Sequence, residues 1–255
     1  MILFLFFQAG ISSASTGLED PAVKEKQEEL LERLKTRGLS EDYLLRVFSD
    51  SRVTLYPENV YRQGKGLNYT GRRFGLLTKK SLKMGRNLIV TQKRILGKIQ
   101  NDYGVNAEVL VAILRIETNF GRYVGKHLIF NTLLTMALIE NRRSAWAEEE
   151  LGHLLRFCRE QQKDPLMIKG SWAGAFGIPQ FIPSSYVKYG VDGNGDGVID
   201  LDNLPDALAS MANYLKAFGW SQDDPASKKE ALFAYNRCDH YVEAVLTYAR
   251  ALSRK

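Results

Sequence analysis

Residues 111–122 read VAILRIETNFGR, an apolar run that carries one glutamate, Glu117. Ile113 and Glu117 are four residues apart, so on a helix the carboxylate lies in line with the apolar stripe. Burial there disfavours the ionised form and raises the pKa of a carboxyl group, which suits a general acid near neutral pH. A glutamate at the core edge, paired to Arg115 or Arg122, is the alternative that this stretch alone leaves open.

Helical periodicity continues on both sides of this stretch, whereas alternating strand patterns are scarce. The stretch 56–76 is rich in Gly, Asn and Arg without a clear period and predicts an irregular connection. We therefore expect a mainly α protein with at most small β pieces. The predicted helices cover residues 24–36, 40–47, 81–103, 106–120, 130–140, 145–162, 205–218 and 229–252.

Composition places few limits on function. The chain has 255 residues, 45% of them hydrophobic and 25% charged, which is enough for one large domain or two small ones. A formal net charge of +6 favours polyanions, among them nucleic acid, anionic lipid and peptidoglycan. Because no Lys/Arg block, zinc-ligand pattern or aromatic nucleic-acid signature occurs, we expect no nucleic-acid partner.

The first residues indicate export. Residues 1–7 are apolar but too few to span a bilayer, and the small residues 12–15 suit signal-peptidase cleavage. We expect a signal peptide over residues 1–17, no lipid-anchoring cysteine and no stable membrane insertion of a soluble periplasmic or otherwise exported protein. A frayed N-terminus of a cytosolic protein is the alternative. Cys158 and Cys238 allow either one disulfide or two buried thiols.

A second distinctive stretch is GSWAGAFGIPQFIPSS, residues 170–185. Gly174 and Gly177 would let main-chain amides approach a ligand closely. The side chains of Ser171 and Gln180 can hydrogen-bond the hydroxyl or acetamido groups of a sugar. Packing of a tight loop is the competing interpretation.

These two stretches together resemble one enzyme family. The run ETNFGR resembles the catalytic-glutamate motif of lytic transglycosylases of the lysozyme-like superfamily, and residues 170–185 resemble the substrate-groove segment of the lytic murein transglycosylase B family. The resemblance implies a lysozyme-like domain that cuts peptidoglycan glycan strands. It covers residues 104–251 and includes the segments 164–166, 212–220 and 234–241.

The resemblance also implies roles for particular residues. It makes Glu117 the catalytic acid and then the base. The substrate-binding residues that it implies are Ser171, Gln180, Tyr235, Asn236 and Tyr69. We expect the catalytic domain over residues 81–255, preceded by a small helical appendage and connection over 18–80. Between Trp220 and Ala234 we expect only a short polar connection, where larger relatives carry an insertion.

An acidic loop, DGNGDGVID at residues 192–200, follows the EF-hand register. Oxygen ligands stand at its positions 1, 3 and 5, but Asn203 replaces the usual glutamate at position 12. The family resemblance implies a longer loop that a later aspartate closes. The predicted ligands of a structural Ca²⁺ are Asp192, Asn194, Asp196, the carbonyl of Val198 and Asp206. We expect no organic cofactor, and a metal-free acidic turn is the alternative.

The expected reaction is cleavage of the β-1,4 bond between N-acetylmuramic acid and N-acetylglucosamine, with formation of a 1,6-anhydro ring. Residues 170–185 and 234–236 contain no Asp or Glu, whereas hydrolysis needs a second carboxylate. A hydrolytic lysozyme that uses a residue such as Glu58, and a non-catalytic peptidoglycan-binding module, are the alternatives. The sequence does not indicate an oligomeric state.

Overall fold

A computed structural model describes residues 17–60, 68–69, 71 and 74–254. The predicted signal peptide lies outside the described residues except for its last position, and so does much of the predicted connection at 56–76. Within the described ranges, no helix is both long enough and apolar enough to cross a membrane.

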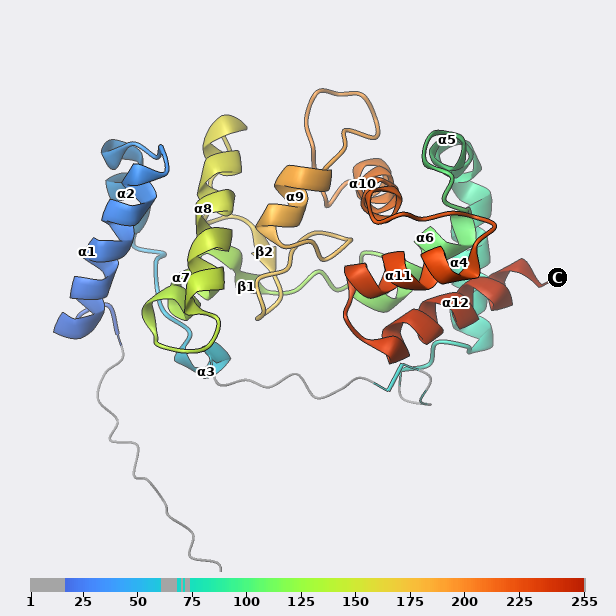
Figure 1. Cartoon of the computed structure of the whole chain (residues 1–255), viewed down its shortest axis with the longest axis horizontal. Helices are drawn as coiled ribbons and strands as arrows, with labels where there is room; N and C mark the ends of the chain where they lie inside the picture. The colour runs from blue at the N-terminus through green and yellow to red at the C-terminus, as the bar shows by residue number, and fades with distance from the viewer. Residues whose placement is uncertain (1–16, 61–67, 70, 72–73, 255) are drawn as a thin grey trace, which may run out of the picture.

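The described chain is mainly helical, as predicted, with one two-stranded antiparallel sheet in which His127 pairs with Gly170. Figure 1 shows α1 and α2 at one end, α4, α5 and α12 at the other, and the strands between them. The elements in chain order are α1 (Pro21–Thr36), α2 (Glu41–Phe48), α3 (Pro57–Val60), α4 (Lys79–Thr91), α5 (Lys93–Tyr103), α6 (Ala107–Thr118), β1 (His127–Leu128), α7 (Ile129–Leu138), α8 (Ser144–Glu160), β2 (Lys169–Gly170), α9 (Pro183–Tyr189), α10 (Leu204–Ala217), α11 (Pro225–Tyr235) and α12 (Asp239–Ser253).

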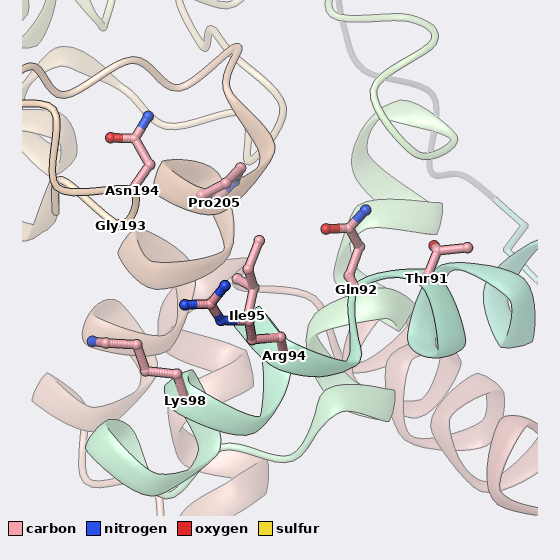
Figure 2. A pocket seen from close by; sticks show the side chains of 8 residues that line it. All are labelled: Thr91, Gln92, Arg94, Ile95, Lys98, Gly193, Asn194 and Pro205. Atoms are coloured by element: carbon pink, nitrogen blue, oxygen red, sulfur yellow. The ribbon is translucent and has the colours of Figure 1, made fainter.

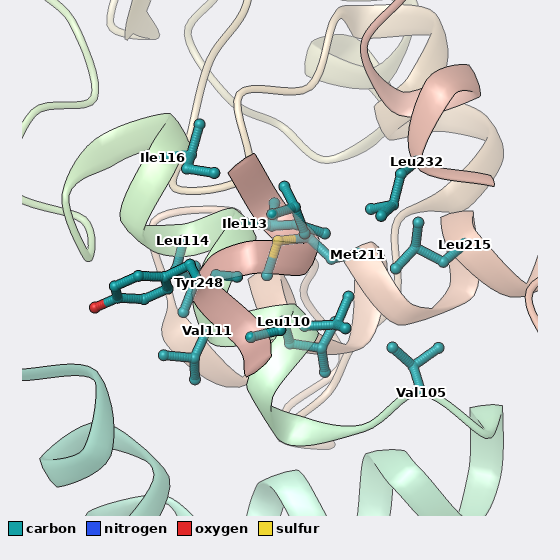
Figure 3. Close-up of a cluster of buried hydrophobic side chains, with 14 of the residues drawn as sticks. Val105, Leu110, Val111, Ile113, Leu114, Ile116, Met211, Leu215, Leu232 and Tyr248 are labelled. Carbon is teal, nitrogen blue, oxygen red and sulfur yellow. The ribbon is translucent and has the colours of Figure 1, made fainter. Parts of the chain in front are cut away.

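One hydrophobic core surrounds α6. Figure 3 shows the α6 side chains, among them Leu110 and Ile113, packed with Met211 of α10 and Leu232 of α11. The helix is buried on nearly every side, which explains its almost continuously apolar sequence. It ends where Asn119 takes a left-handed conformation, with φ at 50°. The last turn of α6, which carries Glu117, therefore packs against this core.

A second core joins the N-terminal helices to α7 and α8. Leu30 and Leu34 of α1 and Phe48 of α2 belong to the same buried cluster as Phe130 of α7, and the rings of Phe48 and Phe130 meet edge to face at 5.2 Å. Burial of such side chains contributes about 1.5–3 kcal/mol each. The helices α1 and α2 thus share a core with later elements, and the domain division at residue 80 stays a prediction.

Two predicted helices are divided in the structure. The helix predicted over 81–103 breaks at Gln92, where φ is −104° and ψ is 18°. Its first half, α4, packs against α6 and α12, whereas α5 packs mainly against α10, so one straight helix could not serve both halves. The helix predicted over 229–252 breaks at residues 236–238, where Asn236 is extended with φ at −144°.

The prediction of only a short polar connection between Trp220 and Ala234 is wrong, because the helix α11 occupies most of this stretch. Pro225 stands at the start of α11, and the Asp224 side chain caps the helix by accepting a hydrogen bond from the main-chain N–H of Ala226 at 2.9 Å. This Asp-Pro start was the missed signal.

Cys158 and Cys238 are free thiols, so of the two alternatives the disulfide does not form.

Candidate functional site

Glu117 lies in the last turn of α6 and is only partly accessible to solvent. Desolvation raises the pKa of its carboxyl group from 4.5 to about 7, and the nearby Tyr241 hydroxyl partly opposes this shift. Glu117 forms no salt bridge in the described part of the chain, so pairing to Arg115 or Arg122 does not neutralise it. A carboxyl group with this pKa is mostly protonated below pH 7 and about half protonated at pH 7.

Tyrosine side chains from different segments surround this carboxyl. The charge of Glu117 contributes to raised pKa values of Tyr69, Tyr235 and Tyr241, which places all three hydroxyls near it. The ring of Tyr241 lies 5.9 Å from that of Tyr69 and 6.3 Å from that of Tyr235. The buried Tyr241 hydroxyl faces Glu117 without a hydrogen bond of good geometry.

We call Tyr69, Tyr235 and Tyr241 together the tyrosine wall. The sequence alone could not bring them together, because they come from different segments of the chain. Tyr69 and Tyr235 were predicted at the site, whereas Tyr241 in the first turn of α12 was not included there. The signal that could have found it is the family resemblance of the segment 234–241, in which Tyr241 stands six residues after Tyr235. Tyr235 packs against both hydrophobic cores, so the candidate site lies where the two cores meet.

The loop of residues 170–181 reaches the end of α6 through main-chain contacts. The Thr118 hydroxyl donates to the carbonyl oxygen of Ile178 at 3.1 Å, and the Tyr235 hydroxyl donates to that of Pro179 at 2.7 Å. Asn236 follows directly, half-buried at the C-terminal end of α11. The structure therefore brings the loop, Tyr235 and the end of α6 into one place, and their role in binding substrate stays a prediction.

Ser171 and Gln180 use much of their hydrogen-bonding capacity inside the loop. The Ser171 hydroxyl oxygen accepts bonds from the amides of Ala173 at 3.3 Å and Ala175 at 3.1 Å. Gln180 donates through Nε2 to the carbonyl oxygens of Val124 and Gly177, both at 3.0 Å. Because both amide donors of Gln180 are used, its side-chain oxygen is the atom left for a ligand. Tight-loop packing and ligand contact are thus compatible here.

The acidic loop is curled around its first carboxylate. Asp192 accepts hydrogen bonds from the main-chain amides of Gly195, Asp196 and Gly197, at 2.6, 3.2 and 2.7 Å respectively. These bonds lower the pKa of Asp192. Gly195 and Gly197 have φ values of 80° and 87°, which explains why glycine stands at these positions.

Asp206 is fully buried at the start of α10 and closes the other side of the loop. It accepts bonds from the amides of Gly193, Asn194 and Asp200 at 3.0, 3.3 and 2.8 Å. No cluster of three or more His, Cys, Asp or Glu side chains arranged to hold a metal ion occurs among the described residues. The predicted ligand set therefore stays a prediction.

A separate pocket of about 490 Å³ lies between the start of α5 and the acidic loop. Figure 2 shows Arg94, Ile95 and Lys98 on one side and Asn194 and Pro205 on the other. Glu117 does not line it, so the pocket is distinct from the candidate catalytic site.

Comparison with known proteins gives consistent matches. Residues 22–230 match the family described as the transglycosylase SLT domain. The membrane-bound lytic murein transglycosylase B of Escherichia coli (strain K12) is 47% identical over 122 residues. That alignment covers 48% of this chain and 34% of the relative, so the chain aligns with about a third of that protein's length.

Solved structures match over more of the chain. The Escherichia coli lytic transglycosylase Slt35 in complex with calcium superposes with a TM-score of 0.80 at 25% identity, over 92% of this chain and 93% of that one. The soluble lytic transglycosylase SltB1 from Pseudomonas aeruginosa superposes with a TM-score of 0.81 at 25% identity, over 90% and 98%.

Proposed function

Because this chain belongs to the family of transglycosylase SLT domains, we propose that it is a lytic transglycosylase that cleaves the glycan strands of peptidoglycan. The observation that carries this proposal is the carboxyl group of Glu117, whose pKa burial raises to about 7. A general acid works best when its pKa lies near the operating pH. The 47% identity to a lytic murein transglycosylase over 122 residues supports the same reaction class.

In the proposed reaction, Glu117 protonates the oxygen that links N-acetylmuramic acid to N-acetylglucosamine, and this bond then breaks. The 2-acetamido group of the muramic acid stabilises the positive charge that develops at the anomeric carbon, as in substrate-assisted glycosidases. The Glu117 carboxylate then removes the proton from the 6-hydroxyl group, whose oxygen closes the 1,6-anhydro ring. Glu117 ends protonated as it began, and no water is consumed.

The isolation of Glu117 from other carboxylates supports lytic cleavage over hydrolysis. Every Asp and Glu of the chain lies in the described residues, and no second carboxylate contributes to the pKa of Glu117. The alternative base, Glu58, is exposed on α3, which packs against α7. Figure 1 shows α3 beside α7 and away from α6. Activation of water by a second carboxylate therefore lacks a candidate at this site.

Digestion of purified peptidoglycan in water enriched in oxygen-18 tests the reaction. We expect muropeptides that end in 1,6-anhydro-N-acetylmuramic acid and carry no label, as measured by mass spectrometry. A digest by a hydrolytic lysozyme in the same water is the control, because hydrolysis places the label at the reducing end. Labelled muramic acid ends from this protein would make it a lysozyme instead.

We also propose that the loop of residues 192–206 holds a structural Ca²⁺. Asp192, Asn194, Asp196, the Val198 carbonyl and Asp206 would supply hard oxygen ligands, which Ca²⁺ prefers. The side-chain oxygen Oδ1 of Asn203, at loop position 12, is buried without a hydrogen-bond partner among the described residues, which fits an oxygen that faces a bound cation. A related protein, Slt35, has been solved in complex with calcium.

Calcium is expected to raise the melting temperature of the protein, and Asp192→Ala or Asp206→Ala is expected to abolish the rise. At a free concentration of 100 times the dissociation constant, binding stabilises the folded state by about 2.7 kcal/mol. The measurement is a melting curve in calcium and in chelator. Asp223→Ala, an exposed residue outside the loop, is the control and should keep the full rise. Identical curves for the unchanged protein in both buffers would remove the proposed site.

A further inference from the structure

Arg115 is a buried cation without an acidic partner. It lies on α6 two residues before Glu117, and only 9% of its surface is exposed. Every Asp and Glu of the chain lies in the described residues, and none of them forms a salt bridge with Arg115. Burial accordingly lowers the pKa of its guanidinium group.

A buried cation of this kind costs stability, and an apolar residue of similar volume at the same place is often at least as stable. The remaining hydrophobic positions of α6 show that this helix readily accommodates apolar side chains. A contribution to the free energy of folding therefore does not explain why an arginine stands at position 115. The contacts of its side chain indicate its role instead.

The guanidinium group joins α6 to a segment that is distant in sequence, residues 74–81. It donates through Nε to the Ser81 hydroxyl on α4 at 2.9 Å and through Nη2 to the main-chain carbonyl oxygen of Phe74 at 2.7 Å. The same group lies over the Phe74 ring, 4.9 Å from its centroid. Arg115 thus holds both the main chain and the side chain of Phe74.

Phe74 in turn contacts the tyrosine wall of the candidate site. Its ring meets that of Tyr69 edge to face at 5.4 Å, and the ring of Tyr69 meets that of Tyr241 at 5.9 Å. Tyr69 is 9% exposed and lies close enough to Glu117 for the carboxylate charge to raise its pKa. An unbroken series of contacts therefore leads from Arg115 to the surroundings of the glutamate.

We propose that Arg115 is a positioning residue for the catalytic site: it holds Phe74 in place, and Phe74 holds Tyr69 beside the catalytic glutamate. This inference rests on the proposed role of Glu117. The titratable side chains that face Glu117 from the packed elements are Tyr69, Tyr235 from α11 and Tyr241 from α12. Arg115 forms no salt bridge with the Glu117 carboxylate, so it acts indirectly. It acts through Tyr69, Tyr235 and Tyr241, the tyrosine wall that shields the carboxylate from water.

The substitution Arg115→Met tests the proposal through the pH dependence of catalysis. Loss of the contacts to Phe74 admits water to Glu117, so its pKa falls toward 4.5 and the alkaline limb of the kcat profile moves down by about one to two pH units. We expect a loss of roughly tenfold in kcat at pH 7 and near-normal kcat at pH 5. Arg115→Lys, which can still donate to the Phe74 carbonyl, should recover part of the shift.

Two further variants separate positioning from general stability. Phe74→Leu keeps the carbonyl acceptor but removes the ring, so it should shift the profile in the same direction and add little to Arg115→Met in the double variant. Arg86→Met is the matched control, since Arg86 also donates to main-chain carbonyl oxygens, those of Ala251, Leu252 and Arg254. It should lower the melting temperature without moving the profile.

The titration of Glu117, followed by NMR in substrate-free protein with ¹³C-labelled glutamate, provides a readout independent of activity. It reports the effect of Arg115 even if the protein fails to cleave peptidoglycan. A folded Arg115→Met variant with an unchanged Glu117 titration and an unchanged kcat profile would overturn the proposal. If Arg115→Met does not fold, unchanged titrations in both Phe74→Leu and Arg115→Lys would overturn it as well.

Discussion

Replacing Glu117 with glutamine is expected to lower the rate of peptidoglycan cleavage by about 10²- to 10⁴-fold and to leave the fold intact. The amide has the same shape as the carboxyl group, but it can neither deliver a proton to the leaving oxygen nor accept one from the 6-hydroxyl group. Because Glu117 is proposed to serve both steps, the loss should fall at the upper end of this range. The measurement is the initial rate of muropeptide release.

Stability gives this variant an internal check with a definite sign. The pKa of Glu117 is raised from 4.5 to about 7 in the folded protein, so its contribution to stability is present below about pH 4.5 and is lost as the pH rises through 7. Glutamine carries no such dependence. The melting temperature of Glu117→Gln relative to the unchanged protein should therefore increase from pH 5 to pH 8.

The control for this substitution is Glu108→Gln, at the opposite end of the same helix. The Glu108 carboxylate accepts a hydrogen bond from Asn106 at 3.1 Å and lies outside the candidate site. We expect this variant to cleave peptidoglycan at a rate close to that of the unchanged protein. Residual activity of Glu117→Gln above a tenth of that rate would reject Glu117 as the general acid.

Replacing Gly125 with alanine is expected to destabilise the protein by about 3 kcal/mol or more. The glycine has φ at 106°, a conformation that L-residues rarely adopt, and a left-handed main chain alone costs about 1–2 kcal/mol. A Cβ atom there would also lie 2.0 Å from the carbonyl oxygen of Gly170, and overpacking typically costs about 1–3 kcal/mol more. The midpoint of urea unfolding measures the loss.

This substitution should also reduce activity, because Gly125 lies next to the loop of residues 170–181, which contacts the candidate site. Val124 accepts a hydrogen bond from Gln180, and Gly170 pairs with His127 in the small sheet. The control is Gly38→Ala, which has φ at 89° but no atom within 4 Å of the added Cβ. It carries the conformational cost without the collision. Equal destabilisation by both variants would show that the close approach of Gly125 to Gly170 does not matter.

The sequence by itself determined the features that depend on residues close together in the chain. The four-residue spacing from Ile113 to Glu117 placed the carboxylate on the buried side of α6, because helical geometry alone decides which side chains share a face. The fixed offsets from Asp192 to Gly197 likewise predicted a curled acidic loop, because the bonds that Asp192 accepts join residues at most five positions apart.

Only the tertiary structure decided the features that depend on which elements pack together. Periodicity continued through Gln92, but the helix breaks there because α4 and α5 pack against different partners. Tyr69 and Tyr241 are 172 positions apart, by subtraction of their residue numbers, and no local pattern could bring them together around Glu117. The bond from Arg115 to the carbonyl oxygen of Phe74 is of the same kind. A main-chain oxygen carries no residue-specific signal, so its partner is decided by packing alone.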